Sequence, residues 1–243
     1  MGKSHALALA AQGAKVAITD VNAKDCLPVA EEIKSKGGEA ICFQMDVSNK
    51  TEVDQVFDEV VKQFGRLDIL VNNAGIYFPK TALELTEKDW DKMIDINLKG
   101  QFLCAQRAAK EMAKNKWGRI INISSVASGQ VGVGILGGAH YTASKGGVIG
   151  LSETLAVEWA PLGINVNVIA PGPVDTPLLR KAFNNDLKTI EEYRRMALRG
   201  IASCDEIATM IVFMASDACN FMNGAIVPFD GGESILYAGE PPK

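Results

Sequence analysis

Tyr141 and Lys145 are the residues of this sequence whose types and spacing point most directly to chemistry. They lie four positions apart in a small-residue stretch that predicts a helix, so one helical turn places both side chains on the same face. A cation near a tyrosine favours the phenolate, and we expect Lys145 to lower the pKa of Tyr141 from its usual value of about 10. A tyrosine of this kind serves as a general acid or base near neutral pH.

Two serines precede this helix. An apolar run at residues 119–123 predicts a buried strand, and Ser124 and Ser125 follow at its carboxyl end, where their hydroxyls would hold a carbonyl oxygen close to the phenol. An isolated tyrosine–lysine pair at this spacing is most often a surface tyrosine beside a solvated lysine. The assignment therefore depends on further motifs.

Three such motifs accompany the pair. Residues 72–75 (NNAG) follow an apolar strand, Asn97 lies in the sequence INLKG, and residues 171–174 (PGPV) follow another apolar strand. In this order and at these spacings the chain resembles the short-chain dehydrogenase/reductase family, from Gly2 to about Gly232. The resemblance implies a hydride-transferring oxidoreductase that uses a nicotinamide cofactor.

Helices and short apolar strands alternate along the whole chain, which is typical of a parallel sheet covered on both faces. We predict one α/β domain, residues 1–243, with the Rossmann-like, doubly wound sheet of the family. The sequence predicts strands at 14–19, 40–45, 67–72, 119–123, 164–169 and 225–229, and its longest helices at 86–115 and 141–160. In the helix predicted within 23–36, we expect Pro28 to confine the regular part to the later residues.

The predicted sheet has one strand fewer than the family's sheet, and the strand that is not seen is the first, which is central in the family. Gly2 lies 18 residues before Asp20 and, by resemblance, matches the third glycine of the family's glycine-rich turn. We favour the interpretation that the real gene product has residues ahead of Met1. The alternative is that the protein manages without them, by rearranged strands or borrowed segments.

Composition excludes several classes of function. A net charge of −4 leaves no basic footprint for nucleic acid. No apolar run approaches the roughly 18 residues that span a bilayer, and nothing resembles a signal peptide, so we expect a cytoplasmic protein without a membrane partner. The five cysteines are odd in number and show no metal-binding spacing, which predicts buried free thiols. We expect no metal site.

The resemblance also assigns the adenosine end of the cofactor site. Asp20 ends a strand at the position that contacts a ribose 2′-OH, where its carboxylate would repel a 2′-phosphate. NAD is therefore favoured over NADP, with basic Lys24 nearby as the reservation. Asp46 is assigned to the adenine amino group, with the Val47 backbone beside it; the alternative is an aspartate that starts a loop and caps the next helix. The adenosine ribose is assigned to the turn formed by Asn73, Ala74 and Gly75.

At the nicotinamide end, the resemblance assigns Pro171 and Gly172 to the cofactor-binding turn. It assigns the Val174 backbone and the Thr176 hydroxyl to the nicotinamide carboxamide. The segment that follows mixes apolar and charged residues without a clear pattern, and we expect residues 173–200 to form a mobile lid over the substrate.

The family's catalytic set maps onto Asn97, a serine, Tyr141 and Lys145. Tyr141 exchanges the hydroxyl proton, Lys145 also grips the nicotinamide ribose, and Asn97 holds a water of a proton relay; a backbone-bonded asparagine that kinks its helix is the other interpretation of Asn97. Alignment on the strand at 119–123 selects Ser125. Counting the family's usual separation back from Tyr141 selects Ser128, and we prefer Ser125 because a strand end is the more rigid anchor.

We therefore expect an oxidoreductase that moves hydride between NAD(H) and a secondary alcohol or its ketone, assembled as a homo-oligomer, either a tetramer or a dimer. Two alternatives remain open. One is reduction of a 3-oxoacyl thioester on a carrier protein. The other is a non-enzymatic scaffold or nucleotide sensor that kept the fold and lost the phosphate-binding turn.

Overall fold

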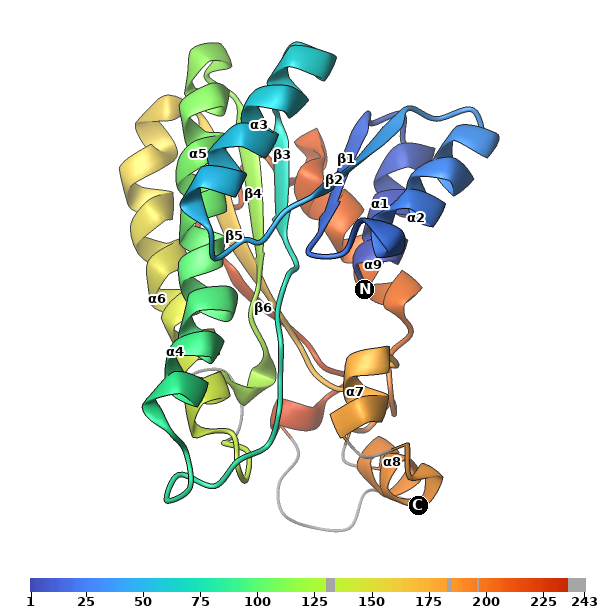
Figure 1. Ribbon diagram of the computed structural model, residues 1–243, viewed down its shortest axis with the longest axis vertical. Coiled ribbons are helices and arrows are strands. Elements are labelled where there is room, and N and C mark those ends of the chain that lie inside the picture. The colour runs from blue at the N-terminus through green and yellow to red at the C-terminus, as the bar shows by residue number, and fades with distance from the viewer. Residues whose placement is uncertain (130–133, 183–184, 196, 236–243) are drawn as a thin grey trace.

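A four-stranded parallel sheet lies between two layers of helices in the computed structural model, which describes residues 1–129, 134–182, 185–195 and 197–235 (Figure 1). The strand order is β3-β4-β5-β6. The strands are β3 (Ile69–Asn72), β4 (Gly118–Ile123), β5 (Ile164–Pro171) and β6 (Ile226–Phe229). A second parallel sheet consists of β1 (Val16–Asp20) and β2 (Ala40–Gln44).

Three helices cover one face of the larger sheet: α3 (Lys50–Phe64), α5 (Gly100–Asn115) and α6 (Ala139–Trp159). Phe57 of α3 and Leu155 of α6 share a buried apolar cluster with Ile120 of β4. This layer is relevant to function because α6 carries both Tyr141 and Lys145.

The opposite face is covered by α1 (Gly2–Ala11) and α9 (Cys204–Ala215). Ile211 of α9 packs in a buried cluster with Ile121 of β4, and Leu9 of α1 lies against the same cluster. Helix α2 (Ala23–Ser35) closes the smaller sheet through a third cluster that includes Val29 and Ala6.

Local sequence signals explain where several helices begin and end. The Asn49 side chain accepts hydrogen bonds from the first turn of α3, which ends at Gly65 with φ +81°. A capping box formed by Thr86 and Asp89 starts α4 (Glu87–Ile94), and Ser203 forms the same motif with Glu206 at α9.

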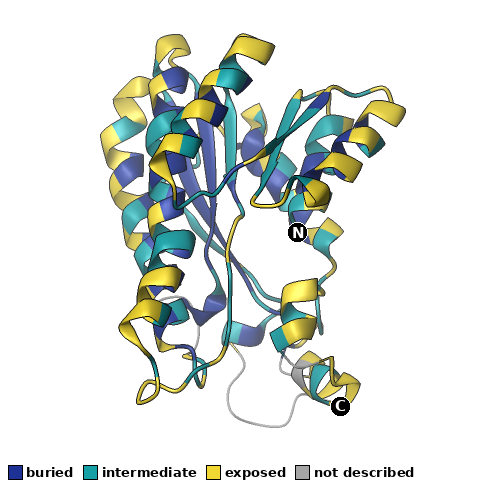
Figure 2. Cartoon of the chain, in the orientation of Figure 1, coloured by how far each residue is buried: buried dark blue, intermediate teal, exposed yellow. Residues whose placement is uncertain are grey.

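The two sheets are separate, and among the described residues no strand joins β1 to β3. Each of these strands is paired on one side only. All residues of β1 are half-buried, whereas all residues of β4 are buried (Figure 2). The six strands and the Rossmann-like α/β class were predicted, and both are confirmed.

Three helical predictions need correction. Residues 86–115 are not one α-helix, because a π-helical segment, η1 (Asp95–Lys99), separates α4 from α5. Helix α2 runs through Pro28, and Lys24, whose carbonyl loses its helical partner, is an exposed residue. The segment expected to be irregular contains two short helices, α7 (Pro177–Ala182) and α8 (Leu187–Arg194).

The prediction of five free thiols is also wrong. Cys26 and Cys42 form a disulfide, because α2 lies against β2 and brings their Cα atoms to 5.6 Å. Cys104 and Cys219 are buried free cysteines, as expected, and Cys204 is half-buried.

Short 3-10 turns complete the description: η2 (Val126–Ser128), η3 (Ala160–Leu162), η4 (Asp217–Cys219) and η5 (Glu233–Ile235). In the part of the chain that the structure describes, no helix has the length and apolar character of a membrane span, and no acidic, histidine or cysteine groups gather as metal ligands would. Parts of the predicted lid (183, 184 and 196), of the loop before Tyr141 (130–133) and the carboxyl-terminal tail (236–243) lie outside the described residues.

Candidate active site

The carboxyl end of β4 brings Ser125 to Tyr141. Ser125 lies two residues beyond Ile123, the last residue of the strand, and its hydroxyl is hydrogen-bonded to the Tyr141 phenol. The Ser125 Oγ also accepts a hydrogen bond from the Ala127 backbone N–H at 3.0 Å, which orients the hydroxyl. Ser128, the alternative serine, is 5% exposed in the η2 turn.

Lys145 lies on the same face of α6 as Tyr141, one turn further on. Its Nζ is 5.7 Å from the Tyr141 ring centroid and donates a hydrogen bond to the Ile123 carbonyl at 2.8 Å. Ser124 was expected to hold a carbonyl oxygen of a ligand. Instead Ser124 is 2% exposed, and its hydroxyl donates to the Lys145 backbone carbonyl at 2.8 Å, so it ties α6 to the end of β4.

The electrostatics of the pair differ from the sequence prediction. Burial raises the pKa of the Tyr141 phenol, and the Ser125 hydrogen bond opposes that rise. Burial also lowers the pKa of Lys145 to about 8. The prediction that Lys145 lowers the pKa of Tyr141 is wrong, because the ammonium is buried against the Ile123 carbonyl rather than bonded to the phenol.

Two aromatic contacts next to the phenol were not anticipated. Tyr77 meets the Tyr141 ring edge to face, with 5.1 Å between ring centroids, and Phe78 meets His140 in the same way at 4.9 Å. The signal in the sequence is the aromatic pair Tyr77 and Phe78, which follows the turn at Gly75.

Asn97 is fully buried in the π-helical segment η1. Its amide closes two hydrogen bonds on the backbone of one residue: the Ile76 N–H donates to Oδ1 at 2.8 Å, and Nδ2 donates to the Ile76 carbonyl at 2.9 Å. The expected backbone-bonded, helix-distorting asparagine is therefore what the structure shows. The proposed water relay is compatible with it, since Asn97 and Lys145 both lie near Gly75.

The turn after β3 is built for a close approach. A Cβ on Gly75 would stand 3.3 Å from Asn97 Oδ1 and 3.7 Å from Lys145 Nζ. Glycine therefore leaves the space between the turn and these two polar side chains free of a side chain. Asn72 points inward and bonds the Asn122 side chain of the neighbouring strand at 2.8 Å. Asn73 follows, beside Ala74, and a Cβ on Gly2 would lie 2.9 Å from its Nδ2. The amino end of α1 thus meets this turn.

Two acidic residues lie at or just beyond the carboxyl ends of the strands of the smaller sheet. Asp20 closes β1, and its Oδ1 accepts the Asn22 backbone N–H at 2.9 Å. Asp46 follows β2 and accepts both the backbone N–H and the hydroxyl of Ser48, at 2.8 and 2.7 Å. Asp46 therefore shapes the loop but does not cap α3, and Val47 next to it packs toward Gly100.

The turn after β5 is held from two sides. The Gly172 N–H donates to the Phe229 carbonyl at 3.1 Å, and a Cβ on Gly172 would meet Glu233 Oε2 at 2.9 Å. Pro171 is the last residue of β5, and Val174 is buried and forms a bridge with Ala202. The Thr176 hydroxyl accepts the Leu179 N–H at 3.2 Å at the start of α7.

These residues fit a nicotinamide dinucleotide at both ends. The Asn73 Oδ1 is buried without a hydrogen-bond partner among the described residues. This oxygen can therefore accept a hydrogen bond from a ligand in the turn that ends at Gly75. Lys145 makes one hydrogen bond in the described structure and has three donors, which leaves two for ribose hydroxyls. Between the two ends, the first turn of α1, from Gly2 onward, offers free backbone N–H groups to a diphosphate.

Comparisons with known proteins identify the family. Residues 1–234 match the family model described as Enoyl-(Acyl carrier protein) reductase. The chain is 38% identical to the (2S)-[(R)-hydroxy(phenyl)methyl]succinyl-CoA dehydrogenase subunit BbsD of Thauera aromatica, over 98% of this chain and 94% of that protein. It is 39% identical to 3-oxoacyl-[acyl-carrier-protein] reductase FabG of Staphylococcus epidermidis, over 96% of this chain and 93% of that protein.

The structure is also similar to solved structures. The crystal structure of levodione reductase superposes with a TM-score of 0.92 at 32% identity, covering 97% of this chain and 94% of that one. A putative gluconate dehydrogenase from Agrobacterium tumefaciens gives a TM-score of 0.90 at 31% identity, with 97% and 92% covered. The fold and the site define a Rossmann-like oxidoreductase. The chain belongs to the short-chain dehydrogenase/reductase family.

Proposed function

We propose that this protein transfers hydride between NAD(H) and a secondary alcohol or its ketone. The observation that carries the proposal is the cluster at the carboxyl end of β4, where Ser125 is hydrogen-bonded to Tyr141 and Lys145 stands one helical turn away. A hydroxyl donor, a phenol and an ammonium in one place are the groups needed to polarise a carbonyl and to move one proton.

Each residue has a separate task in this mechanism. Tyr141 donates its proton to the carbonyl oxygen during reduction and takes it back during oxidation. Ser125 donates a hydrogen bond to the same oxygen, and Lys145 binds the nicotinamide ribose and stabilises the phenolate. Asn97 holds the segment after β3 in place and supports the return of the proton to Tyr141. The nicotinamide, when bound, accepts or supplies the hydride.

Asp20 supports NAD as the cofactor. Its carboxylate lies at the carboxyl end of β1 and accepts one backbone N–H, which leaves its other oxygen for a ribose diol. A 2′-phosphate would bring like charge to this carboxylate. The remaining cofactor contacts are proposed for Gly2, Asp46, Val47, Asn73, Ala74, Gly75, Pro171, Gly172, Val174 and Thr176.

A second candidate is reduction of a 3-oxoacyl thioester, because relatives at 39% and 41% identity carry that activity in their names. Both candidates use the same proton and hydride chemistry and differ in what is attached to the carbonyl. For either, we propose that the segment at 173–200, which includes α7 and α8, closes over the substrate.

We further propose a cytoplasmic homo-oligomer, either a tetramer or a dimer. Helix α6 presents an apolar surface that its own sheet does not use, with Val157 77% exposed. Light scattering at micromolar concentration measures the assembly, and a monomer would contradict this part of the proposal.

The test of the function has two stages. Calorimetric titration with NADH and with NADPH first asks whether the chain binds a nicotinamide cofactor, since a scaffold would show no binding. A screen of secondary alcohols, diols, sugars, hydroxysteroids and acyl thioesters then follows nicotinamide absorbance. Binding followed by turnover of a secondary alcohol or ketone supports the proposal; binding without turnover of any compound contradicts it.

A further inference from the structure

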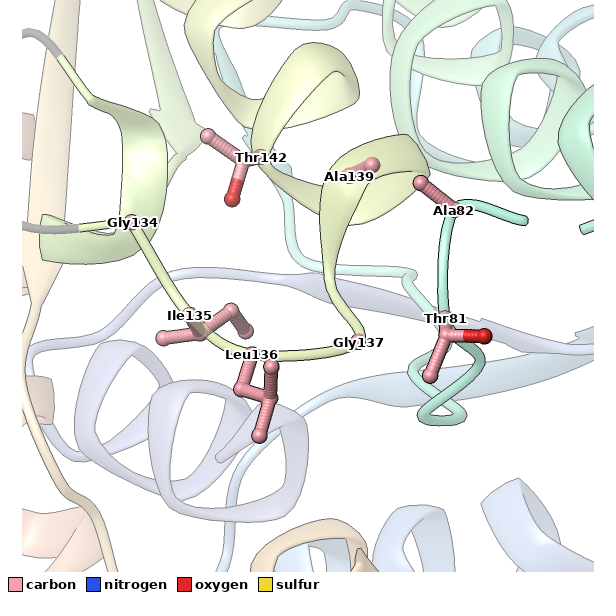
Figure 3. A pocket seen from close by; sticks show the side chains of 8 residues that line it. All are labelled: Thr81, Ala82, Gly134, Ile135, Leu136, Gly137, Ala139 and Thr142. Carbon is pink, nitrogen blue, oxygen red and sulfur yellow. The ribbon is translucent and has the colours of Figure 1, made fainter. Parts of the chain in front are cut away.

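An apolar pocket of about 360 Å³ opens next to the helix that carries Tyr141 (Figure 3). Two segments far apart in the sequence form it. Its lining residues are Thr81, Ala82, Gly134, Ile135, Leu136, Gly137, Ala139 and Thr142. The volume lies within the range of about 300–1,000 Å³ that is usual for sites of small organic ligands.

The chemistry of the walls is apolar with one polar group inside. Methyl and alkyl groups form most of the lining, and in Figure 3 the methyl groups of Ala82 and Ala139 face each other across one end. The Thr142 hydroxyl points toward the Ile135 side of the pocket. This oxygen is buried and has no hydrogen-bond partner within the described ranges, which is costly unless a ligand supplies one.

Sequence neighbours of Tyr141 and of its aromatic partner Tyr77 lie in the two walls of the pocket. On one wall, Thr142 directly follows Tyr141 in α6. On the other, the segment that begins at Tyr77, whose ring touches Tyr141, continues to Thr81 and Ala82. The Lys80 N–H donates to the Gly137 carbonyl at 2.8 Å, so the two walls are tied together.

The mouth of the pocket is apolar as well. Leu136 lines it and is 95% exposed, and Leu83, next to Ala82 in sequence, is 100% exposed. Large aliphatic side chains held open to water on both rims of an apolar pocket are typical of a binding site for an apolar group. A pocket for a sugar or another polyol would instead present several polar side chains.

We propose that this pocket binds the apolar arm of the substrate, and that the substrate class is a ketone or secondary alcohol with an alkyl or aryl arm of several carbons. The inference rests on the proposed function, because it places the carbonyl at Tyr141. The arm leaves the carbonyl carbon, passes Thr142 and reaches the leucine rims. A single polar atom along the arm, such as an ether or thioester oxygen, would bond the Thr142 hydroxyl.

A series of methyl ketones from 2-butanone to 2-decanone tests the proposal. Burial of each added CH₂ should raise kcat/KM about fourfold until the pocket is filled. Ala82→Trp fills the pocket from an exposed turn and should flatten this dependence. Glu87→Trp adds the same ring at an exposed residue outside both the lining and the rims and should keep the dependence. Thermal unfolding verifies that both variants are folded.

Three results would overturn the inference: no dependence on chain length in the parent, the same dependence in Ala82→Trp, or its loss in Glu87→Trp as well. Equilibrium binding of 2-decanone and 2-butanone, measured by calorimetry without turnover, separates this inference from the proposed function. Suppose that the protein binds 2-decanone preferentially, that Ala82→Trp abolishes this preference, and that no ketone is turned over. This result would refute the proposed function and support the pocket as a binding site. Turnover of short polar alcohols without binding of 2-decanone would support the proposed function and refute the apolar pocket as the substrate site.

Discussion

The ammonium nitrogen of Lys145 lies 5.7 Å from the ring centroid of Tyr141 and donates its hydrogen bond to a backbone carbonyl of β4, not to the phenol. Burial lowers the pKa of Lys145 to about 8 and raises that of Tyr141. The Tyr141 phenol is therefore weakly acidic and lies beside a lysine that loses its charge at mildly alkaline pH.

Lys145→Met should weaken NADH binding and lower kcat together, because the lysine both binds the ribose and stabilises the phenolate. In the parent, affinity for the anionic cofactor should fall as pH rises through about 8, where Lys145 loses its proton. The variant should lack this part of the pH dependence. Calorimetric titrations at pH 6.5 and 9.5 measure the affinity and its pH dependence, and steady-state kinetics measures kcat. If the affinity of the variant depends on pH as that of the parent does, Lys145 does not face the cofactor.

Ser125→Ala should lower kcat by about 10²–10³-fold, the usual cost of losing one hydrogen-bond donor to a developing oxyanion. Ser128→Ala is the matched control and should retain most of the activity. Steady-state kinetics on the substrate found in the screen compares the two. A larger loss in Ser128→Ala would transfer the catalytic role to that serine.

Asp20→Ala should weaken NAD binding and narrow the preference for NAD over NADP. Charge-assisted hydrogen bonds of this kind contribute about 1.5–3 kcal/mol, and the variant also loses the repulsion of a 2′-phosphate. The measurement is the ratio of kcat/KM for the two cofactors. An unchanged ratio would remove Asp20 from the ribose site.

Glu233→Gln should stabilise the protein at neutral pH. Burial, with the neighbouring Asp230 charge, raises the pKa of Glu233 from 4.5 to about 7, so the folded state holds a proton that the unfolded state releases between these pH values. Stability contributed by the protonated carboxyl is present below pH 4.5 and is lost as pH rises through 7.

At about 1.36 kcal/mol per pKa unit, that loss reaches at most about 3 kcal/mol. Urea unfolding at pH 5 and pH 8 checks the sign. The free energy of unfolding of the variant should exceed that of the parent by more at pH 8 than at pH 5. An equal difference at both pH values would mean that Glu233 titrates normally.

Much of the fold could be predicted from local signals. Asn49 and Gly65 delimit α3 as their chemistry predicts, and the buried apolar runs became β4 and β5. The serine beside the phenol was also within reach, because a strand end fixes Ser125 more firmly than a glycine-rich loop fixes Ser128. These predictions depend on short-range geometry, which the sequence encodes directly.

Features that depend on distant packing were not predictable. The Cys26–Cys42 disulfide requires α2 to lie against β2, and nothing in a spacing of 16 residues shows that. The π-helical turn at Asn97 arises from hydrogen bonds to the Ile76 backbone 21 positions away. The pKa of Tyr141 is set by burial, which a motif of two residues does not reveal.

The comparison of Tyr141→Phe with the parent tests the central claim most directly. The substitution removes one oxygen and keeps the ring that meets Tyr77 edge to face, so NADH titration should give nearly the parent affinity. Proton transfer is lost, and kcat should fall at least 10²-fold, within the usual range of about 10²–10⁴ for general acid–base catalysis. A variant that keeps more than about a tenth of the parent kcat would contradict the account and leave Tyr141 as a packing residue.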